Sequence, residues 1–99
     1  MERLFVYGTL RDPLVQIRVI GRTATGSIDF LDGYQRGTIK LGEREYPILD
    51  AAASDNYVEG LVLEVSTDEL QRLDIYETSA YRRIRVSLRS GGEAWTYAR

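Results

Sequence analysis

Apolar positions change their spacing several times along the chain, and each spacing predicts a different element. The apolar run within residues 3–7 is consecutive rather than alternating, which is typical of a buried strand. Asp12 followed by Pro13 favours a helix start, because Asp caps free N–H groups and Pro fits the first helical position. Residues 14–20 are apolar on most sides, and Gly21 is a typical helix end. We therefore expect a strand followed by a helix of about two turns.

Residues 24–49 have the pattern of strands joined by tight turns. Asp32-Gly33 is a dipeptide typical of hairpin turns, and it lies between two β-prone runs. Gly42 marks another turn. The apolar residues that follow it include Pro47, which favours an edge strand or a strand end because proline lacks an N–H donor. Small and polar residues then predict a loop before the next strand.

The segment from residue 57 to residue 76 predicts a strand followed by a helix. Apolar residues within 57–65 share one face of a strand. Ser66 and Glu69 have the separation of a capping box, in which each side chain bonds the backbone N–H of the other residue. The helix cannot extend far beyond Tyr76, because a strand pattern begins a few residues later.

The last part of the chain predicts a hairpin. Residues 81–88 alternate between apolar and polar side chains, residues 90–93 read Ser-Gly-Gly-Glu, and residues 94–97 form the last β-prone run. The whole chain then holds about six or seven strands and two short helices. We expect an α+β fold in which a small, mostly antiparallel sheet is strongly curved or closed into a barrel and flanked by short helices.

Length and composition limit the class of protein. A chain of 99 residues predicts one domain, 1–99. No apolar run approaches the ~20 residues of a membrane span, and no basic segment precedes an apolar leader, so we expect a cytoplasmic protein with no membrane partner. The formal net charge is −2, which does not favour nucleic acid as a partner. No feature of the sequence indicates an oligomeric state.

Two absent residue types restrict the chemistry. The chain has no cysteine and no histidine, which excludes a disulfide, a Cys nucleophile, a His base and a zinc site built from these residues. Aspartates do not cluster with metal-ligand spacing. We therefore expect no metal and no cofactor, and any proton transfer must use Asp, Glu, Tyr, Lys40 or the substrate itself.

One candidate site is the turn Tyr7-Gly8-Thr9-Leu10. It follows the first strand and precedes the helix start, so it can present unpaired backbone N–H groups to an anion or to a carbonyl oxygen that is gaining charge. Gly8 allows close approach of the backbone. Taken alone, such a turn is more often only a connection.

A second candidate is Glu77, at the end of the second predicted helix. A carboxylate gains nothing from the helix dipole at a C-terminus, so this glutamate is either solvated or retained for another reason. Most carboxylates in such places have structural causes.

Together the two motifs resemble a known family. The turn Tyr7 to Leu10, followed late in the chain by the pattern Leu-Asp-x-x-Glu-x-x-x-Tyr-x-Arg at residues 73–83, is similar to the γ-glutamylcyclotransferase-like family. That family includes γ-glutamylamine cyclotransferases and the plant AIG2-like proteins. Many of its members have glycine after the glutamate, where this chain has Thr78.

The resemblance implies a fold, a site and a reaction. The fold would be a closed or nearly closed β-barrel. Tyr7, Gly8, Thr9 and Leu10 would line a cavity and bind the γ-glutamyl part of the substrate, with Glu77 as the catalytic residue opposite and Tyr81 shaping the pocket. The substrate's own α-amino group would attack its γ-carbonyl, releasing 5-oxoproline and an amine. The turn amides would hold either the developing oxyanion or the substrate α-carboxylate, and both roles stay open here.

Two alternatives come from other classes of protein. The scaffold could serve as a non-catalytic module that binds a small carboxylate or amine. Nucleic-acid binding through Arg82, Arg83, Arg85 and Arg89 is disfavoured, because an alternating strand needs polar residues on its wet face and the chain is acidic overall.

Overall fold

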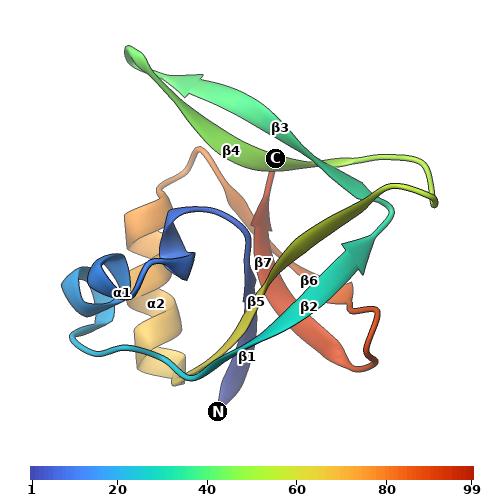
Figure 1. The fold of residues 1–99 in the computed structure, drawn as a ribbon. Coiled ribbons are helices and arrows are strands. Elements are labelled where there is room, and N and C mark those ends of the chain that lie inside the picture. The colour runs from blue at the N-terminus through green and yellow to red at the C-terminus, as the bar shows by residue number, and fades with distance from the viewer.

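Seven strands, two α-helices and one short 3₁₀ turn make up the fold, which a computed structural model describes for residues 1–99 (Figure 1). In chain order the elements are β1 (Glu2–Val6), η1 (Thr9–Arg11), α1 (Pro13–Ile20), β2 (Gly26–Asp32), β3 (Tyr34–Leu41), β4 (Arg44–Ala51), β5 (Tyr57–Val65), α2 (Thr67–Glu77), β6 (Arg82–Ser87) and β7 (Glu93–Ala98). The α+β prediction is therefore confirmed. Neither helix is both long and apolar enough to cross a bilayer.

The strands form two sheets. The larger has the order β2-β5-β1-β7-β6, and the hairpin β3–β4 makes a separate two-stranded sheet. All pairings are antiparallel except the contact between β1 and β7, which is parallel. The larger sheet is not closed by a ladder, but it curls until the Arg89 N–H donates to the Phe30 carbonyl at 2.9 Å, joining the end of β6 to the opposite edge strand β2.

One predicted hairpin is wrong. Gly33 does adopt a positive φ of 82°, as a tight turn at Asp32-Gly33 requires, but the strands on either side of it do not pair with each other. Instead β2 pairs with β5, while β3 pairs with β4. The Gly33 N–H donates to Asn56 and its carbonyl accepts from Ala52, both at 2.9 Å. The dipeptide therefore carries the chain from one sheet to the other.

The other turn and cap predictions are confirmed. Gly42, at φ 67°, joins β3 to β4, and the two strands form the whole of their sheet, so Pro47 lies in an edge strand. In α1 the Asp12 side chain accepts from the Leu14 N–H at 2.9 Å, and Gly21 ends the helix with φ 78°. In α2 the capping box between Ser66 and Glu69 is complete in both directions.

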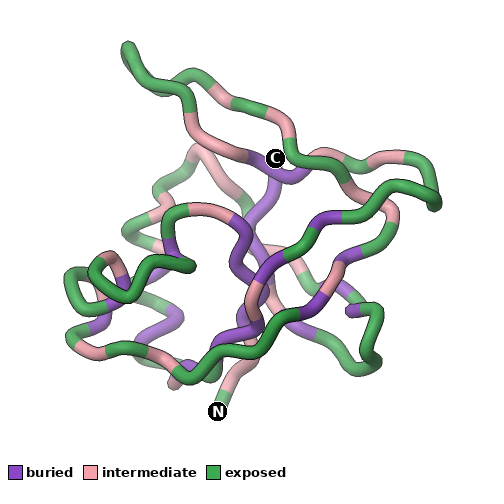
Figure 2. The backbone as a smooth tube through the Cα atoms, in the orientation of Figure 1, coloured by how far each residue is buried: buried purple, intermediate pink, exposed green.

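The side chains of β1 divide the core into two clusters. Leu4 and Val6 face α1 and α2, where they pack with residues such as Leu10 and Leu73. Phe5 points the opposite way, into the concave side of the curled sheet. In Figure 2 the central strands are largely buried, whereas the far end of the β3–β4 hairpin is exposed. The turn after β1 therefore starts from the buried end of a central strand and reaches the surface between the helices and the hairpin.

Candidate functional site

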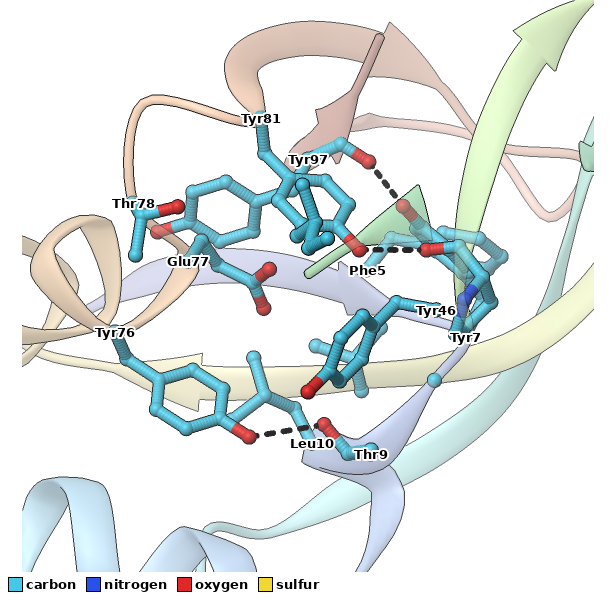
Figure 3. Close-up of a pocket in the computed structure, with 14 residues that line it drawn as sticks. Phe5, Tyr7, Thr9, Leu10, Tyr46, Tyr76, Glu77, Thr78, Tyr81 and Tyr97 are labelled. Atoms are coloured by element: carbon cyan, nitrogen blue, oxygen red, sulfur yellow. Dashed lines mark hydrogen bonds between the residues drawn. The ribbon is translucent and has the colours of Figure 1, made fainter. Parts of the chain in front are cut away.

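A cavity of about 260 Å³ lies where three segments meet: the turn after β1, the end of α2 with the loop that follows it, and the β3–β4 hairpin (Figure 3). Most of its wall is apolar or aromatic. The lining residues are Phe5, Val6, Tyr7, Gly8, Thr9, Leu10, Leu41, Tyr46, Pro47, Tyr76, Glu77, Thr78, Tyr81 and Tyr97.

All six residues predicted from the sequence to form a site line this one cavity. Tyr7, Gly8, Thr9 and Leu10 form one wall, Glu77 is the last residue of α2, and Tyr81 lies in the loop before β6. The two motifs are some seventy positions apart in the chain, and the fold brings them together.

The turn after β1 differs in detail from the expectation. It does not run straight into α1, because residues Thr9–Arg11 form a separate 3₁₀ turn, closed by a 3.1 Å bond from the Arg11 N–H to the Gly8 carbonyl. The Gly8 N–H donates to no protein atom. Thr9 and Leu10 open the turn, so their N–H groups have no acceptor within it. The turn that lines this cavity therefore carries backbone N–H groups with no acceptor in the protein.

Gly8 is required by a close approach rather than by a positive φ. A Cβ at this position would lie 3.0 Å from Cγ of Pro47, tighter than ordinary packing. The absence of a side chain lets the hairpin residue Pro47 close over the turn. A hydrogen bond to β7 also holds the start of the turn: the buried Tyr7 hydroxyl donates to the Tyr97 carbonyl at 2.5 Å.

Glu77 is the only acidic or basic residue among the cavity's lining residues other than tyrosines, and its carboxyl has no hydrogen-bond or ion-pair partner in the protein. Figure 3 shows it pointing into the cavity between the surrounding tyrosines. Burial disfavours the ionised form and raises the pKa of this carboxyl from 4.5 to about 7. The group can therefore accept and release a proton close to neutral pH.

The preceding turn of α2 carries a second carboxylate with different surroundings. Asp74 accepts a 2.6 Å bond from the Tyr97 hydroxyl and lies 2.9 Å from Nε of Arg83. Burial, and then the bond to Asp74, raise the pKa of the Tyr97 hydroxyl, which keeps it a neutral donor. Because Tyr97 also accepts from Tyr7, these contacts connect the helix that carries Glu77 to the turn opposite.

Two further bonds cross the cavity. The Tyr81 hydroxyl donates to the Pro47 carbonyl at 2.8 Å and so fixes the hairpin to the loop after α2. At the exposed side, the hydroxyls of Tyr76 and Thr9 are 3.1 Å apart, which links the end of α2 to the turn (Figure 3). Burial raises the pKa of the Tyr81 hydroxyl, and the nearby Glu77 carboxylate raises it further. The Tyr81 hydroxyl is therefore neutral around neutral pH.

Sequence reasoning did not select three tyrosines of the lining, namely Tyr46, Tyr76 and Tyr97. Their spacing fits core and edge packing equally well, and only the tertiary fold turns them toward a common space. Of the three, only Tyr76 could have been suspected from the sequence, because it directly precedes the candidate residue Glu77. The described chain holds no group of three or more acidic, His or Cys side chains arranged to bind a metal ion.

The arginines considered for nucleic-acid binding are mostly engaged within the protein. Arg83 and Arg85 lie over the Trp95 ring at 4.4 and 4.9 Å, and Arg83 also pairs with Asp74. Arg89 pairs with Asp32 at 2.6 Å. These contacts give three of the four side chains a structural role in the β6–β7 hairpin and its neighbours.

The chain belongs to the gamma-glutamyl cyclotransferase, AIG2-like family, which it matches over residues 4–99. It is 31% identical over 88 residues to AIG2-like protein A of Arabidopsis thaliana, covering 89% of this chain and 52% of that protein. It is 32% identical over 87 residues to Protein AIG2 C of the same plant, with 88% and 52% covered. The chain thus spans about half the length of these two relatives.

Solved structures agree with the fold. A solution structure of an Arabidopsis thaliana protein is 31% identical and superposes with a TM-score of 0.84, covering 98% of this chain and 67% of that one. A structure described as a gamma-glutamyl cyclotransferase has a TM-score of 0.74 at 13% identity, covering 98% and 65%. At that identity the second likeness concerns the fold alone. The resemblance seen in the two sequence motifs is confirmed at the level of family and fold.

Proposed function

We propose that this protein is a γ-glutamyl cyclotransferase-type enzyme that releases 5-oxoproline and an amine from a γ-glutamyl amine or peptide. The family includes gamma-glutamyl cyclotransferases, which supports cyclotransferase activity in general. One observation of the structure carries the proposal. Glu77 is an unpaired carboxyl with a pKa of about 7, and it shares a cavity with a turn that presents backbone donors.

The reaction needs no nucleophile from the protein. The substrate's α-amino nitrogen attacks its own γ-carbonyl carbon, a five-membered lactam closes, and the bond from that carbon to the leaving nitrogen breaks. A cavity that holds the glutamyl chain bent supplies orientation, which is worth ~7–11 kcal/mol of the barrier in favourable intramolecular reactions. This accounts for a catalyst with no cysteine and no histidine.

Glu77 would move the proton that the reaction must transfer. As a carboxylate it takes a proton from the attacking nitrogen, and as an acid it delivers that proton to the leaving nitrogen. A group performs both steps best when its pKa lies near the working pH, and such a group typically contributes ~10²–10⁴-fold. The pKa of about 7 suits this double role.

The wall from Tyr7 to Leu10 would bind the charged part of the substrate. The cavity contains no lysine or arginine, so backbone N–H groups such as that of Gly8 are the donors available to an α-carboxylate or to the developing oxyanion. A single well-placed oxyanion donor is worth ~2.7–4 kcal/mol. Tyr81 would hold the opposite wall in place through its bond to Pro47.

The test is product formation with a matched variant. The protein is incubated with a panel of γ-glutamyl amines and dipeptides, and 5-oxoproline is measured by mass spectrometry. We expect turnover with at least one compound and its loss in Glu77→Gln, which keeps the shape of the side chain. Folded protein that forms no 5-oxoproline from any of them contradicts the proposal. A compound that stabilises the protein and is recovered unchanged would instead make the chain a binding module.

A further inference from the structure

Arg99, which directly follows β7, contacts both strands of the β3–β4 hairpin. Its Nε and Nη2 donate to the two carboxylate oxygens of Asp50 on β4, at 2.6 and 3.4 Å. Nη2 also donates to the Thr38 carbonyl on β3 at 3.4 Å, and the Arg99 N–H donates to the Leu49 carbonyl on β4 at 3.2 Å. Figure 1 shows the end of β7 beside β4. Together these contacts form what we term the Arg99 clasp.

A glycine on β3 makes room for the clasp. Gly37 has no positive φ, so the backbone conformation does not require a glycine at this position. A Cβ there would collide with Oδ2 of Asp50, the oxygen that accepts from Nη2 of Arg99. Inside a strand, glycine weakens pairing because it adds chain entropy and has no side chain to pack. The space that the Asp50 carboxylate occupies therefore accounts for the glycine.

Beyond the clasp, the hairpin has little else to hold it. From residue 39 to residue 47, a stretch that we term the hairpin arm, the bond from Tyr81 to Pro47 is the one hydrogen bond to another element. In Figure 2 the far end of this arm is exposed. The hairpin residues that line the cavity all lie on the arm, namely Leu41, Tyr46 and Pro47. The orientation of this cavity wall therefore depends on contacts at the base of the arm.

The arm lies directly against the turn after β1. A Cβ on Gly8 would be 3.0 Å from Cγ of Pro47, so the two walls are already in close contact. Asp50 is three residues further along β4, ~10 Å away in an extended strand. Because β3 and β4 are joined by their own ladder, a movement at Asp50 is passed on to Pro47 and the turn. Arg99 does not line the cavity, so it can affect a ligand there only through the hairpin.

We propose that Arg99 is a positioning residue: the clasp orients the hairpin arm, and the arm holds a bound ligand against the turn after β1. The effect on turnover rests on the proposed cyclotransferase function, whereas the effect on the hairpin does not. Loss of the clasp should weaken substrate binding and leave the chemical step unchanged, because neither Arg99 nor its partners on the hairpin line the cavity.

Hydrogen–deuterium exchange of the hairpin amides tests the clasp without any substrate. In Arg99→Gln, the arm amides should exchange roughly two- to fivefold faster than in wild type, the range expected for an exposed ion pair. Arg89→Gln is the matched control, since Arg89 forms an ion pair of the same 2.6 Å length with Asp32 outside the hairpin. The double variant Asp50→Asn/Arg99→Gln should exchange no faster than Arg99→Gln, because the two side chains form one contact.

Gly37→Ala is the decisive variant, because two explanations predict opposite results. By strand propensity alone, alanine in place of glycine stabilises the hairpin and slows exchange. The clasp predicts the reverse, since the new Cβ displaces the Asp50 carboxylate from Arg99 and exchange becomes faster. Slower or unchanged exchange in Gly37→Ala overturns the proposal. So does exchange of the arm amides in Arg99→Gln that equals that in Arg89→Gln.

Kinetics then connect the clasp to the cavity. With a γ-glutamyl amide that the wild-type protein turns over, Arg99→Gln should raise KM roughly two- to fivefold while kcat stays within about twofold. A fall in kcat at unchanged KM overturns the positioning role, and so does faster exchange with both constants unchanged. If the wild-type protein forms no 5-oxoproline from any γ-glutamyl compound, the cyclotransferase function fails, and the exchange measurements alone decide whether the clasp stands.

Discussion

Asp74 and Glu77 lie three residues apart on α2, yet only Asp74 is paired. Asp74 accepts from the Tyr97 hydroxyl at 2.6 Å and lies 2.9 Å from Arg83, whereas Glu77 faces a tyrosine-lined cavity without any partner. Two carboxylates of one helix therefore have different surroundings. Burial without a partner raises the pKa of Glu77 to about 7.

The pH dependence of turnover should therefore follow Glu77. If its carboxylate is the base, kcat/KM falls as pH drops below about 7, by about tenfold for each pH unit well below the pKa. A pH–rate profile measured with a γ-glutamyl amide checks this. The residual activity of Glu77→Gln should lack the acidic limb, and a limb that persists unchanged in that variant would assign the titration to another group.

The same carboxyl should make the folded state sensitive to pH. Its pKa is about 7 in the folded protein and near 4.5 when exposed, so between these values the folded state binds more protons than the unfolded state. The contribution of Glu77 to the free energy of unfolding therefore decreases as pH rises from about 4.5 to 7. Urea unfolding across this range should show Glu77→Gln gaining stability relative to wild type. Parallel curves would contradict the burial of this group.

Glu69 should show the opposite dependence. Arg22 donates two bonds of 2.7 Å to it, and these bonds lower the pKa of the carboxyl to about 2. The stabilisation is fully present above about 4.5 and is lost as pH falls through 2. Glu69→Gln keeps a capping-box side chain but removes the charge. The loss of stability in Glu69→Gln relative to wild type should be largest near neutral pH and should vanish near pH 2. A deficit that does not change with pH would assign the effect to packing.

Tyr97→Phe removes the hydrogen bond to Asp74 and should destabilise the fold by about 1.5 kcal/mol. This value is at the lower end for a hydrogen bond to a charged group, because Asp74 is partly exposed and retains its ion pair with Arg83. Chemical denaturation measures the change in the free energy of unfolding. Tyr57→Phe is the control, since Tyr57 is exposed and its hydroxyl has no partner in the protein. Equal effects in the two variants would show that the Asp74 contact contributes nothing.

Thr78→Gly should stabilise the protein by about 1 kcal/mol, because the strain relieved exceeds the added chain entropy. Thr78 follows Glu77 and has φ 66° and ψ −178°, a conformation in which glycine is strongly preferred. Thr78→Ala keeps the Cβ and should give no gain. If the alanine and glycine variants are equally stabilised, backbone strain is not the cause. The effect would then come from losing the Thr78 hydroxyl, which accepts from the Ala80 N–H.

Local signals predicted most of the elements. The caps at Asp12 and Ser66, the turn at Gly42 and the alternation of 81–88 each depend on neighbouring residues, and each is found in the structure. Asp32-Gly33 misled because a turn dipeptide specifies the reversal of the chain but not the partner of the strand. Long-range pairing of β2 with β5 decides that partner, and no local pattern reports it.

The sequence predicted the two motifs of the candidate site but not the surroundings that the fold gives them. Tyr7 to Leu10 and Glu77 were selected from sequence, and both line the cavity. The pKa of Glu77 depends on burial under the hairpin, and the contributions of Tyr46 and Tyr97 depend on how distant strands meet, so neither could be inferred from spacing.

The β3–β4 hairpin shares no ladder with the five-stranded sheet, and contacts such as the Tyr81–Pro47 bond and the Arg99–Asp50 ion pair hold it in place. The cavity wall is thus divided between two sheets that share no strand ladder. A substitution at an exposed position of the hairpin can therefore reshape one side of the cavity without removing a backbone bond of the five-stranded sheet.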